Sequence, residues 1–97
     1  MASSISSGLQ TADVAAMASG KNRINAVTLF SDGTNACSVL VYDGLTATGT
    51  VVAKVSIGAA SLKTTEHVIF ENPVICNIGI STDVTGTGAG YIVYYGG

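Results

Sequence analysis

His67 is the only histidine of the chain, and histidine is the side chain best suited to acid–base chemistry near neutral pH. A histidine that acts as a base needs a nucleophile to serve and a partner within hydrogen-bond reach. Glu66 is adjacent in sequence, but consecutive residues of a strand point to opposite faces. Serine and threonine are plentiful, yet the sequence contains no G-x-S-x-G nucleophile elbow. We therefore interpret His67 as a surface residue and predict that the protein is not an enzyme.

The residue types that bind metals and phosphates are too scattered to predict a site for either. Zinc sites gather Cys and His at short spacing, whereas Cys37, His67 and Cys76 stand far apart in the sequence. Calcium loops carry carboxylates at alternating positions, and residues 32–35 (DGTN) supply one carboxylate and one amide. The glycine-rich residues 86–90 (GTGAG) lack the lysine and the following helix of a phosphate-binding loop. We expect no metal and no cofactor.

The two cysteines, Cys37 and Cys76, fall inside apolar runs, where a free cysteine behaves as a small hydrophobic residue. Two cysteines do not make a disulfide framework, although a bridge between them stays open as an alternative. We interpret both as reduced core residues of a protein made in a cytoplasm. In agreement, the first ten residues lack the basic and apolar regions of a secretory signal, and no run approaches the ~20 apolar residues that span a bilayer.

The chain carries unusually little charge. Charged residues make up 10% of it, against about 25% in ordinary globular proteins, and the net charge is −2. A free monomer normally covers itself with charged side chains, so this surface consists of Ser, Thr, Asn and Gly or is partly buried against other subunits. Phosphate binding needs clustered cations, and here the four are scattered. We therefore predict no nucleic-acid partner. The cations are Lys21, Arg23, Lys54 and Lys63.

The elements that would position any site are strands. Between residues 23 and 95, short β-branched runs alternate with turns rich in Gly, Asn and Asp at spacings of 8–12 residues. This pattern predicts one domain, residues 21–97, folded as an all-β antiparallel β-sandwich that is jelly-roll-like and has seven or eight short strands. Pro73 is expected to break a strand, because proline cannot donate a ladder hydrogen bond. The expected runs are RINAVTLF, CSVLVYD, TVVAKVSI, KTTEHVIF, PVICNIGI, STDVTG and YIVYY.

Alternation assigns the faces of these strands. In residues 51–57 the odd positions, from Val51 to Ile57, are expected to face the core. In residues 74–80 the inward set is Val74, Cys76, Ile78 and Ile80.

The last strand is apolar or amphipathic on both faces, with Tyr91, Val93 and Tyr95 on one and Ile92 and Tyr94 on the other. A strand covered on both sides usually lies inside a larger assembly or under a neighbour. Tyrosine suits such a contact, because its ring can be buried while its hydroxyl stays paired. We predict that Tyr91, Ile92, Tyr94 and Tyr95 form a subunit interface.

Residues 1–20 differ from the rest, since they are rich in Ser, Ala and Gly and have no sustained period. Residues 11–18 favour a short helix with Thr11 as its N-cap and Gly20 just past its end. A loosely held tail is the second interpretation. The third is an N-terminal arm that docks on a neighbouring subunit through apolar anchors. These anchors would be Ile5, Leu9, Val14 and Met17.

Residues 26–95 resemble the short, Gly/Thr-rich β-sandwich proteins carried by tailed bacteriophages. In that family a strand leads through a G-T-N-A turn to V-x-V-Y-D and then to G-T-V-x-A. A phenylalanine strand follows, with P-V before a G-I-x-x-x-x-T-G-T-G-A hairpin. The segments that carry the resemblance are AVTLFSDGTNACSVLVYDG, GTVVAKVSI, FENPVICNIGI and TGTGAGYIVYY.

The resemblance implies a virion structural protein, and for a free-standing copy of this size a capsid decoration or cement protein, usually trimeric. The implied partners are further copies in a homotrimer and the major capsid protein or other virion proteins. The implied location is the capsid surface, after synthesis in the host cytoplasm, although similar modules also occur in tail and neck assemblies. The family brings no catalytic residues. The main alternative is a receptor- or glycan-binding module of a tail or fibre, because sandwich lectins stack sugars on exposed aromatic residues.

Overall fold

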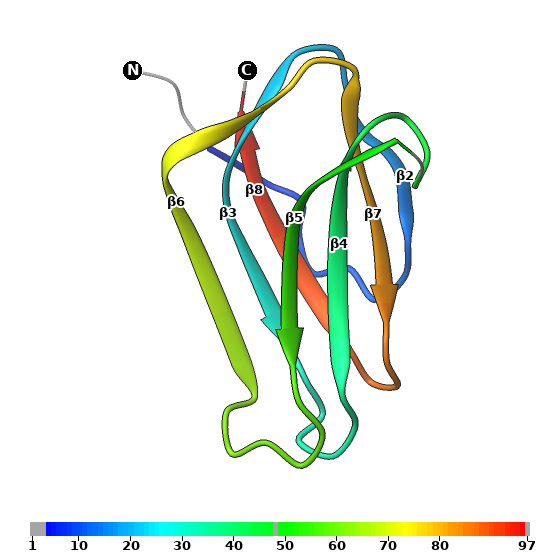
Figure 1. The fold of residues 1–97 in the computed structure, drawn as a ribbon, viewed down its shortest axis with the longest axis vertical. Helices are drawn as coiled ribbons and strands as arrows, with labels where there is room; N and C mark the ends of the chain where they lie inside the picture. The colour runs from blue at the N-terminus through cyan, green and yellow to red at the C-terminus, as the bar shows by residue number, and fades with distance from the viewer. Residues whose placement is uncertain (1–3, 48, 97) are drawn as a thin grey trace.

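The computed structural model describes residues 4–47 and 49–96, and these residues form strands and turns without any helix. The strands fall into two layers that face each other (Figure 1). Strands β1, β8, β3 and β6 make sheet A, and β2, β7, β4 and β5 make sheet B, each in that order. Their bounds are β1 Ile5–Ser6, β2 Val14–Ser19, β3 Asn22–Phe30, β4 Cys37–Asp43, β5 Thr50–Ile57, β6 Thr65–Cys76, β7 Gly79–Thr85 and β8 Gly90–Gly96.

The strand order is that of a jelly roll. Each strand of the first half pairs antiparallel with one of the second half, as β1 with β8, β2 with β7, β3 with β6 and β4 with β5. The chain is therefore one long hairpin that has been wound over on itself. Two further antiparallel pairs, β3 with β8 and β4 with β7, complete the sheets. This arrangement confirms the predicted all-β sandwich.

The core lies between the sheets and is built by strand alternation. Ile24, Val27 and Leu29 point inward from sheet A, and Val39 and Val41 point inward from sheet B, all fully buried. Both cysteines are buried and free, as expected for reduced core residues. Neither sheet can hide these side chains alone, so the two must stack to bury them.

The predicted faces are wrong at Val51, which is 45% exposed. The partner of Val41 is Ala53 and the partner of Tyr42 is Val51, so β5 carries one extra residue at this point. Val52 is that residue, and it packs against the core in place of Val51. A β-bulge moves the neighbouring side chain to the opposite face, and alternation alone does not reveal it.

The predicted run 74–80 is in fact two strands. β6 ends at Cys76, and residues 77–78 turn into β7 of the other sheet, which leaves Ile78 58% exposed rather than inward. Pro73 does not break a strand. It lies within β6 at the edge of sheet A, beside a register shift opposite β3 between Ile24 and Ala26. An edge strand accepts proline because one side of it has no ladder to complete.

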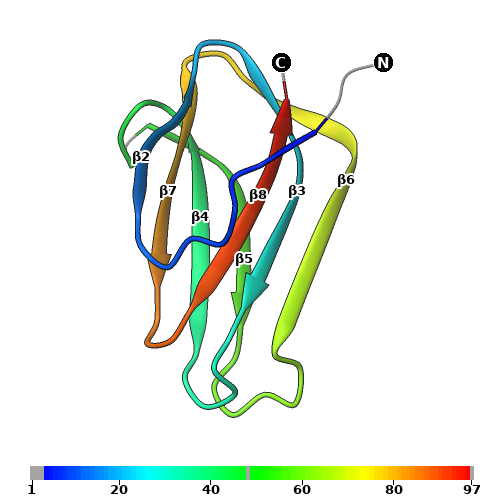
Figure 2. The same cartoon turned by 180° about the vertical axis from the view of Figure 1, so that it is seen from behind.

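The N-terminal segment forms strands and no helix, so the helical interpretation of residues 11–18 is wrong. Ser6 pairs with Tyr94 of β8, and Val14 pairs with Thr82 of β7. Figure 2 shows the segment crossing over β8 and continuing into β2 beside β7. The described part of the expected arm therefore docks on the chain's own sandwich. Pairing with two open sheet edges outweighs a weak local preference for helix.

Candidate functional site

The strongest candidate for a functional surface is the side of sheet A that faces away from the core, here called the outer face of sheet A. In its central part the side chains come from β8, β3 and β6, and none of these carries a full charge as Lys, Arg, Asp or Glu would. The charged residues Arg23 of β3 and Glu71 of β6 are exposed nearer the end of the sheet, each beside an inward residue of its strand. Each central side chain alternates with an inward residue of its strand. The central members are Ile92 and Tyr94, Ala26, Thr28 and Phe30, and His67 and Ile69.

The register of the three strands brings these side chains into rows. Ala26 pairs with Ile69 on one side and with Tyr94 on the other, and Thr28 pairs in the same way with His67 and Ile92. Cross-strand partners of this kind lie within contact distance. Although Ala26 and Thr28 point outward, they are only 8% and 7% exposed, because their larger neighbours cover them. The result is a continuous and mainly apolar surface.

Two shallow depressions lie in this surface. One has a volume of about 300 Å³ and is lined by Leu9, Phe30 and Ile92 together with the glycine-rich residues 88–90. The other has a volume of about 410 Å³ and is more polar. Its lining consists of Ser4, Asn25, Ala26, His67, Ile69 and Tyr94.

Hydrogen bonds within the chain occupy several polar groups of the outer face. His67 Nδ1 is bonded to Thr28 Oγ1, and the ring of His67 meets that of Tyr94 edge to face, with centroids 6.3 Å apart and an interplanar angle of 82°. The Asn25 side chain donates to Ser4 Oγ over 2.7 Å. A hydroxyl beside an imidazole can form a nucleophile–base pair. Thr28 is buried, however, and within the described residues no carboxylate bonds to His67 to orient it.

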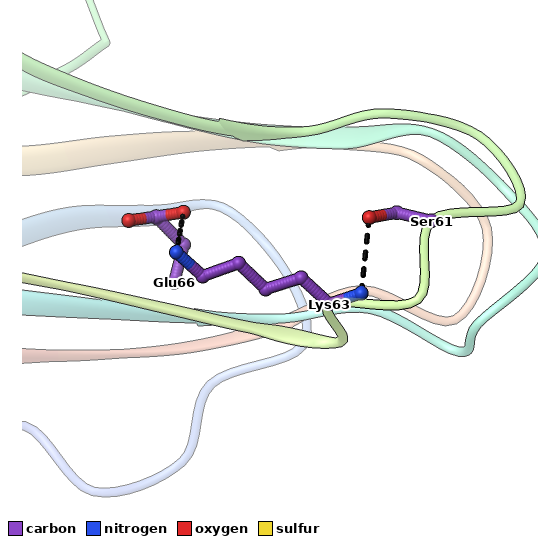
Figure 3. A network of polar contacts seen from close by, with 3 residues as sticks. All are labelled: Ser61, Lys63 and Glu66. Atoms are coloured by element: carbon purple, nitrogen blue, oxygen red, sulfur yellow. Dashed lines mark hydrogen bonds and ion pairs between the residues drawn. The ribbon is translucent and has the colours of Figure 1, made fainter.

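Ion pairing does not organise the outer face of sheet A. Among the described residues, the ion pair found is Lys63 with Glu66, 2.9 Å from Nζ to Oε2, at the start of β6 (Figure 3). The same lysine donates its backbone N–H to Ser61 Oγ over 3.1 Å. The Lys63 side chain is 64% exposed, and exposed pairs contribute little to stability. Its contribution is limited to shaping the turn before β6.

Of the predicted interface residues, Ile92 and Tyr94 lie on the outer face of sheet A. Tyr91 must be corrected to a core residue, because it is fully buried and points between the sheets. Tyr95 shares that inward direction and packs partly against the core. The prediction grouped all four residues, but alternation of β8 divides them between the two faces.

The predicted anchors of the N-terminal segment are also divided. Leu9 is 63% exposed and lines the same depression as Ile92, so the structure brings these two together. Ile5 is 54% exposed at the edge formed by β1. Met17 lies on β2, in the other sheet, and packs partly against the core.

Sequence reasoning missed the contributions of β3 and β6 to this surface. Phe30 and Ala26 of β3, and Ile69 of β6, were not among the predicted residues. A signal for them existed, since residues 23–30 are apolar at both odd and even positions, as residues 91–95 are. Ile69 also shares a face with His67, which was expected to point outward.

Thiol chemistry is disfavoured at both cysteines. Burial raises the pKa of Cys76 to about 11, and the negative charge of Asp43 adds to the effect. Burial, followed by the charge of Asp32, also raises the pKa of Cys37. A thiol with a raised pKa stays protonated at neutral pH and is a poor nucleophile and a poor metal ligand. Within the described residues, no three His, Cys, Asp or Glu side chains gather as a metal site.

No family model, no curated protein and no solved structure matches this chain. In the part of the chain that the structure describes, no helix is long and apolar enough to cross a membrane. The described residues form a jelly roll whose sheet A has a mainly apolar centre on its outer face.

Proposed function

We propose that the protein is a structural virion protein of a tailed bacteriophage, a decoration or cement protein that binds the assembled capsid as a homotrimer. The observation that carries this proposal is the outer face of sheet A, a continuous apolar surface on a jelly roll with very few charges. Jelly rolls recur in viral capsid domains. The resemblance of residues 26–95 to phage β-sandwich proteins supports the same role.

Burial of apolar area would supply the binding free energy. A stable interface buries roughly 800 Å² on each partner. The whole chain exposes 5134 Å², so such an interface would take about a sixth of its surface. Ile69, Leu9 and Ile5, each more than half exposed, would gain free energy from such burial.

Assembly on a capsid adds two effects. Many symmetric copies on one lattice strengthen attachment through avidity, without any single strong contact. A protein that binds the closed shell and not its separated subunits stabilises that shell by mass action. Neither effect requires a catalytic group.

Two measurements test the proposal. Light scattering coupled to size exclusion should give the mass of a trimer over a range of concentrations. Purified protein should then co-sediment saturably with heads of the phage that encodes it, and should raise the temperature at which these heads open. A protein that stays monomeric and leaves the heads unchanged would contradict the proposal.

A second function, glycan binding, is favoured by the depression of about 410 Å³. Its lining combines an aromatic ring, Tyr94, with hydrogen-bonding groups of Asn25, His67 and Ser4 around one opening. Aromatic surfaces beside a few convergent polar groups are typical of small-ligand sites. Binding on a glycan array that is lost in Tyr94→Ala but kept in Tyr42→Ala would favour this function. A pH-dependent hydrolytic activity abolished by His67→Ala would instead revive an enzyme.

A further inference from the structure

Residues 4–20, here called the strap, close one side of the sandwich by completing an edge of each sheet. Against β8, the Ser7 N–H donates to Val93 O, and Gln10 and Tyr91 exchange backbone hydrogen bonds, all over 2.9 Å. Against β7, Asp13 Oδ1 accepts from Val84 N over 2.8 Å. The strap therefore adds β1 to sheet A and β2 to sheet B.

A relay of hydrogen bonds fastens the middle of the strap to the interior. The Tyr91 hydroxyl donates to Ala12 O over 2.7 Å, since a carbonyl can only accept. Thr82 Oγ1 must then donate to Tyr91 Oη, and it accepts in turn from Val14 N over 3.2 Å. Tyr91 and Thr82 are fully buried. Without a strap the Tyr91 and Thr82 hydroxyls would still bond to each other but would lose their hydrogen bonds to Ala12 O and Val14 N. Leaving buried polar groups without such partners costs free energy.

Few side chains of the strap reach the core, and those of Met17 and Ala18 pack only partly against it. None of residues 4–20 is fully buried, and the two largest apolar side chains of its first half, Ile5 and Leu9, are mostly exposed. β2 also follows β7 irregularly, with a register shift between Val14 and Ala18 and a positive φ of 49° at Ala16. The sandwich thus holds its strap through main-chain hydrogen bonds, as in recognition by strand addition, together with the Asp13 carboxylate and the partial packing of Met17.

One tight turn determines that the strap returns to its own sandwich. Only Gly20 and Lys21 connect β2 in sheet B to β3 in sheet A. Gly20 has a φ of +78°, and its N–H donates to Ile78 O over 2.9 Å. If this turn opens, the same strap fits the same edges of another copy, because every copy presents identical strands β7 and β8.

We propose that the strap is exchangeable, and that a second copy of this chain can supply it. Each copy would donate its strap to the next, which closes into a ring when the rotation between copies allows it. Short hinges favour such swapping once the closed turn is disfavoured. At low protein concentration each sandwich binds its own strap rather than that of another copy, because the effective concentration of the tethered strap is in the mM range. The exchange stands apart from the virion role and can hold whether or not the protein binds capsids.

Two chains with one new cysteine each test the exchange. Ser6→Cys on the strap and Tyr94→Cys on β8 occupy directly paired positions, so a disulfide between them is geometrically accessible. When chains of different mass are mixed and oxidised, the mixed disulfide forms specifically when the strap of one lies on β8 of the other. The control pairs Ser6→Cys with Ser56→Cys, which is exposed on β5 of the other sheet and reports random collision.

The hinge should govern the yield of the mixed disulfide. Gly20→Pro forbids the positive φ and removes the N–H that bonds to Ile78 O, so we expect about tenfold more mixed disulfide and a larger native mass. Lys21→Ala should behave like the natural hinge. A Gly20→Pro protein that stays monomeric and crosslinks no more than the collision control would overturn the proposal.

A second experiment keeps the test valid if the Gly20→Pro protein does not fold. The two single-cysteine chains with the natural hinge are then unfolded together, refolded at high concentration and diluted before oxidation. Mixed disulfide above the collision control supports exchange, and a yield equal to that control overturns it. Capsid attachment is measured separately by co-sedimentation. If the virion proposal alone fails, the mixed disulfide still forms but the protein does not bind heads.

Discussion

The two sheets of this jelly roll finish their outer faces in different ways. The centre of the outer face of sheet A is mainly apolar, and its charged residues, Arg23 and Glu71, lie nearer the end of the sheet. The centre of the outer face of sheet B instead places Lys54 and Asp83 on either side of Leu40 as its cross-strand partners. The other outward residues of sheet B are largely hydroxyl-bearing, including Ser38, Ser56 and Thr85. Charged and hydroxyl side chains are stable in water, so most of this side is well solvated by itself, and Val51 is an exposed apolar exception.

A loop also covers sheet B from within the chain. Ser81 points outward from β7 yet is fully buried, and its hydroxyl donates to Thr46 O over 2.8 Å. The Gly44 N–H donates to Gly79 O over 3.1 Å, which ties the start of the same loop to β7. Among the residues that the structure describes, no loop covers Ile69 of sheet A, which is 71% exposed. The difference indicates that sheet A is the side on which a partner would gain most.

The largest difference between the two outer faces should appear when a lysine is introduced on each of them in turn. Ile69→Lys should weaken association between copies by about tenfold or more, because it replaces a buried aliphatic contact with a charge that must be desolvated. Folding should be unaffected, since this side chain is already exposed. Sedimentation over a concentration series measures the effect. The matched variant Ser56→Lys on sheet B should change nothing, and equal losses in both variants would remove the distinction between the faces.

The link between the sheets should carry a pH dependence through the Asp43 carboxylate. The Asp43 carboxylate accepts from the backbone N–H groups of Ile78, Asn77 and Gly79, and these bonds hold its pKa below the ordinary 3.8. Its stabilising contribution is therefore complete above pH ~4, near the ordinary value of an unfolded chain, and is lost as the pH falls through the lowered folded-state value.

Asp43→Asn tests that linkage. The variant should melt at a lower temperature near neutral pH, and the gap to the natural protein should narrow in acid below the ordinary pKa. Asp83→Asn, a carboxylate on the outer face of sheet B, is the matched control and should keep the natural melting temperature at neutral pH. A constant gap for Asp43→Asn from neutral pH to strong acid would mean that its charge is not the cause.

A smaller effect on stability is expected from the hydrogen bond between the Thr28 hydroxyl and the His67 imidazole. Thr28→Val removes the hydrogen bond to His67 Nδ1 but keeps the β-branched shape, so the free energy of unfolding should fall by about 1 kcal/mol. Urea denaturation measures this change. Thr85→Val, on the outer side of β7 in sheet B and exposed, should stay within about 0.5 kcal/mol of the natural protein. A drop of similar size in both variants would argue that the Thr28–His67 bond adds nothing specific.

The smallest effect is expected from the tyrosine hydroxyls of the two outer faces. Tyr94→Phe and Tyr42→Phe should each change stability by no more than about 0.5 kcal/mol. Association should also be unchanged in Tyr94→Phe, because an apolar contact uses the ring and not the hydroxyl. If Tyr94→Phe weakens binding tenfold while Tyr42→Phe does not, the outer face of sheet A recognises a polar ligand and glycan binding gains support.

Much of the fold was predictable because strand periodicity is a local property. The run CSVLVYD coincides with β4, and the alternation of residues 91–95 correctly separates Tyr91 and Val93 from Ile92 and Tyr94. The last strand, β8, is apolar on both faces, and this pattern correctly indicated that the sheet containing it, sheet A, has an apolar outer face. The pattern did not reveal that one of the two faces of β8 packs inside the same molecule. Tyr91, which lies on that face, was therefore assigned to the interface instead of the core.

Three of the errors arise where distant parts of the chain meet. Val51 turns outward because of a bulge opposite β4, and Pro73 is accepted because β6 lies at a sheet edge. Residues 14–19 become a strand because the edge of β7 is open to them. None of these facts is visible in a window of neighbouring residues.

The sequence by itself determined the class of the protein. Runs of β-branched residues with two-residue periodicity, glycine turns and little charge leave an all-β sandwich as the favoured way to bury the apolar side chains. Tertiary structure alone decided the strand order, the outer face of sheet A and the closure by the strap. These depend on which edges and faces remain open after the other strands have paired, and that is a property of the whole chain rather than of any segment.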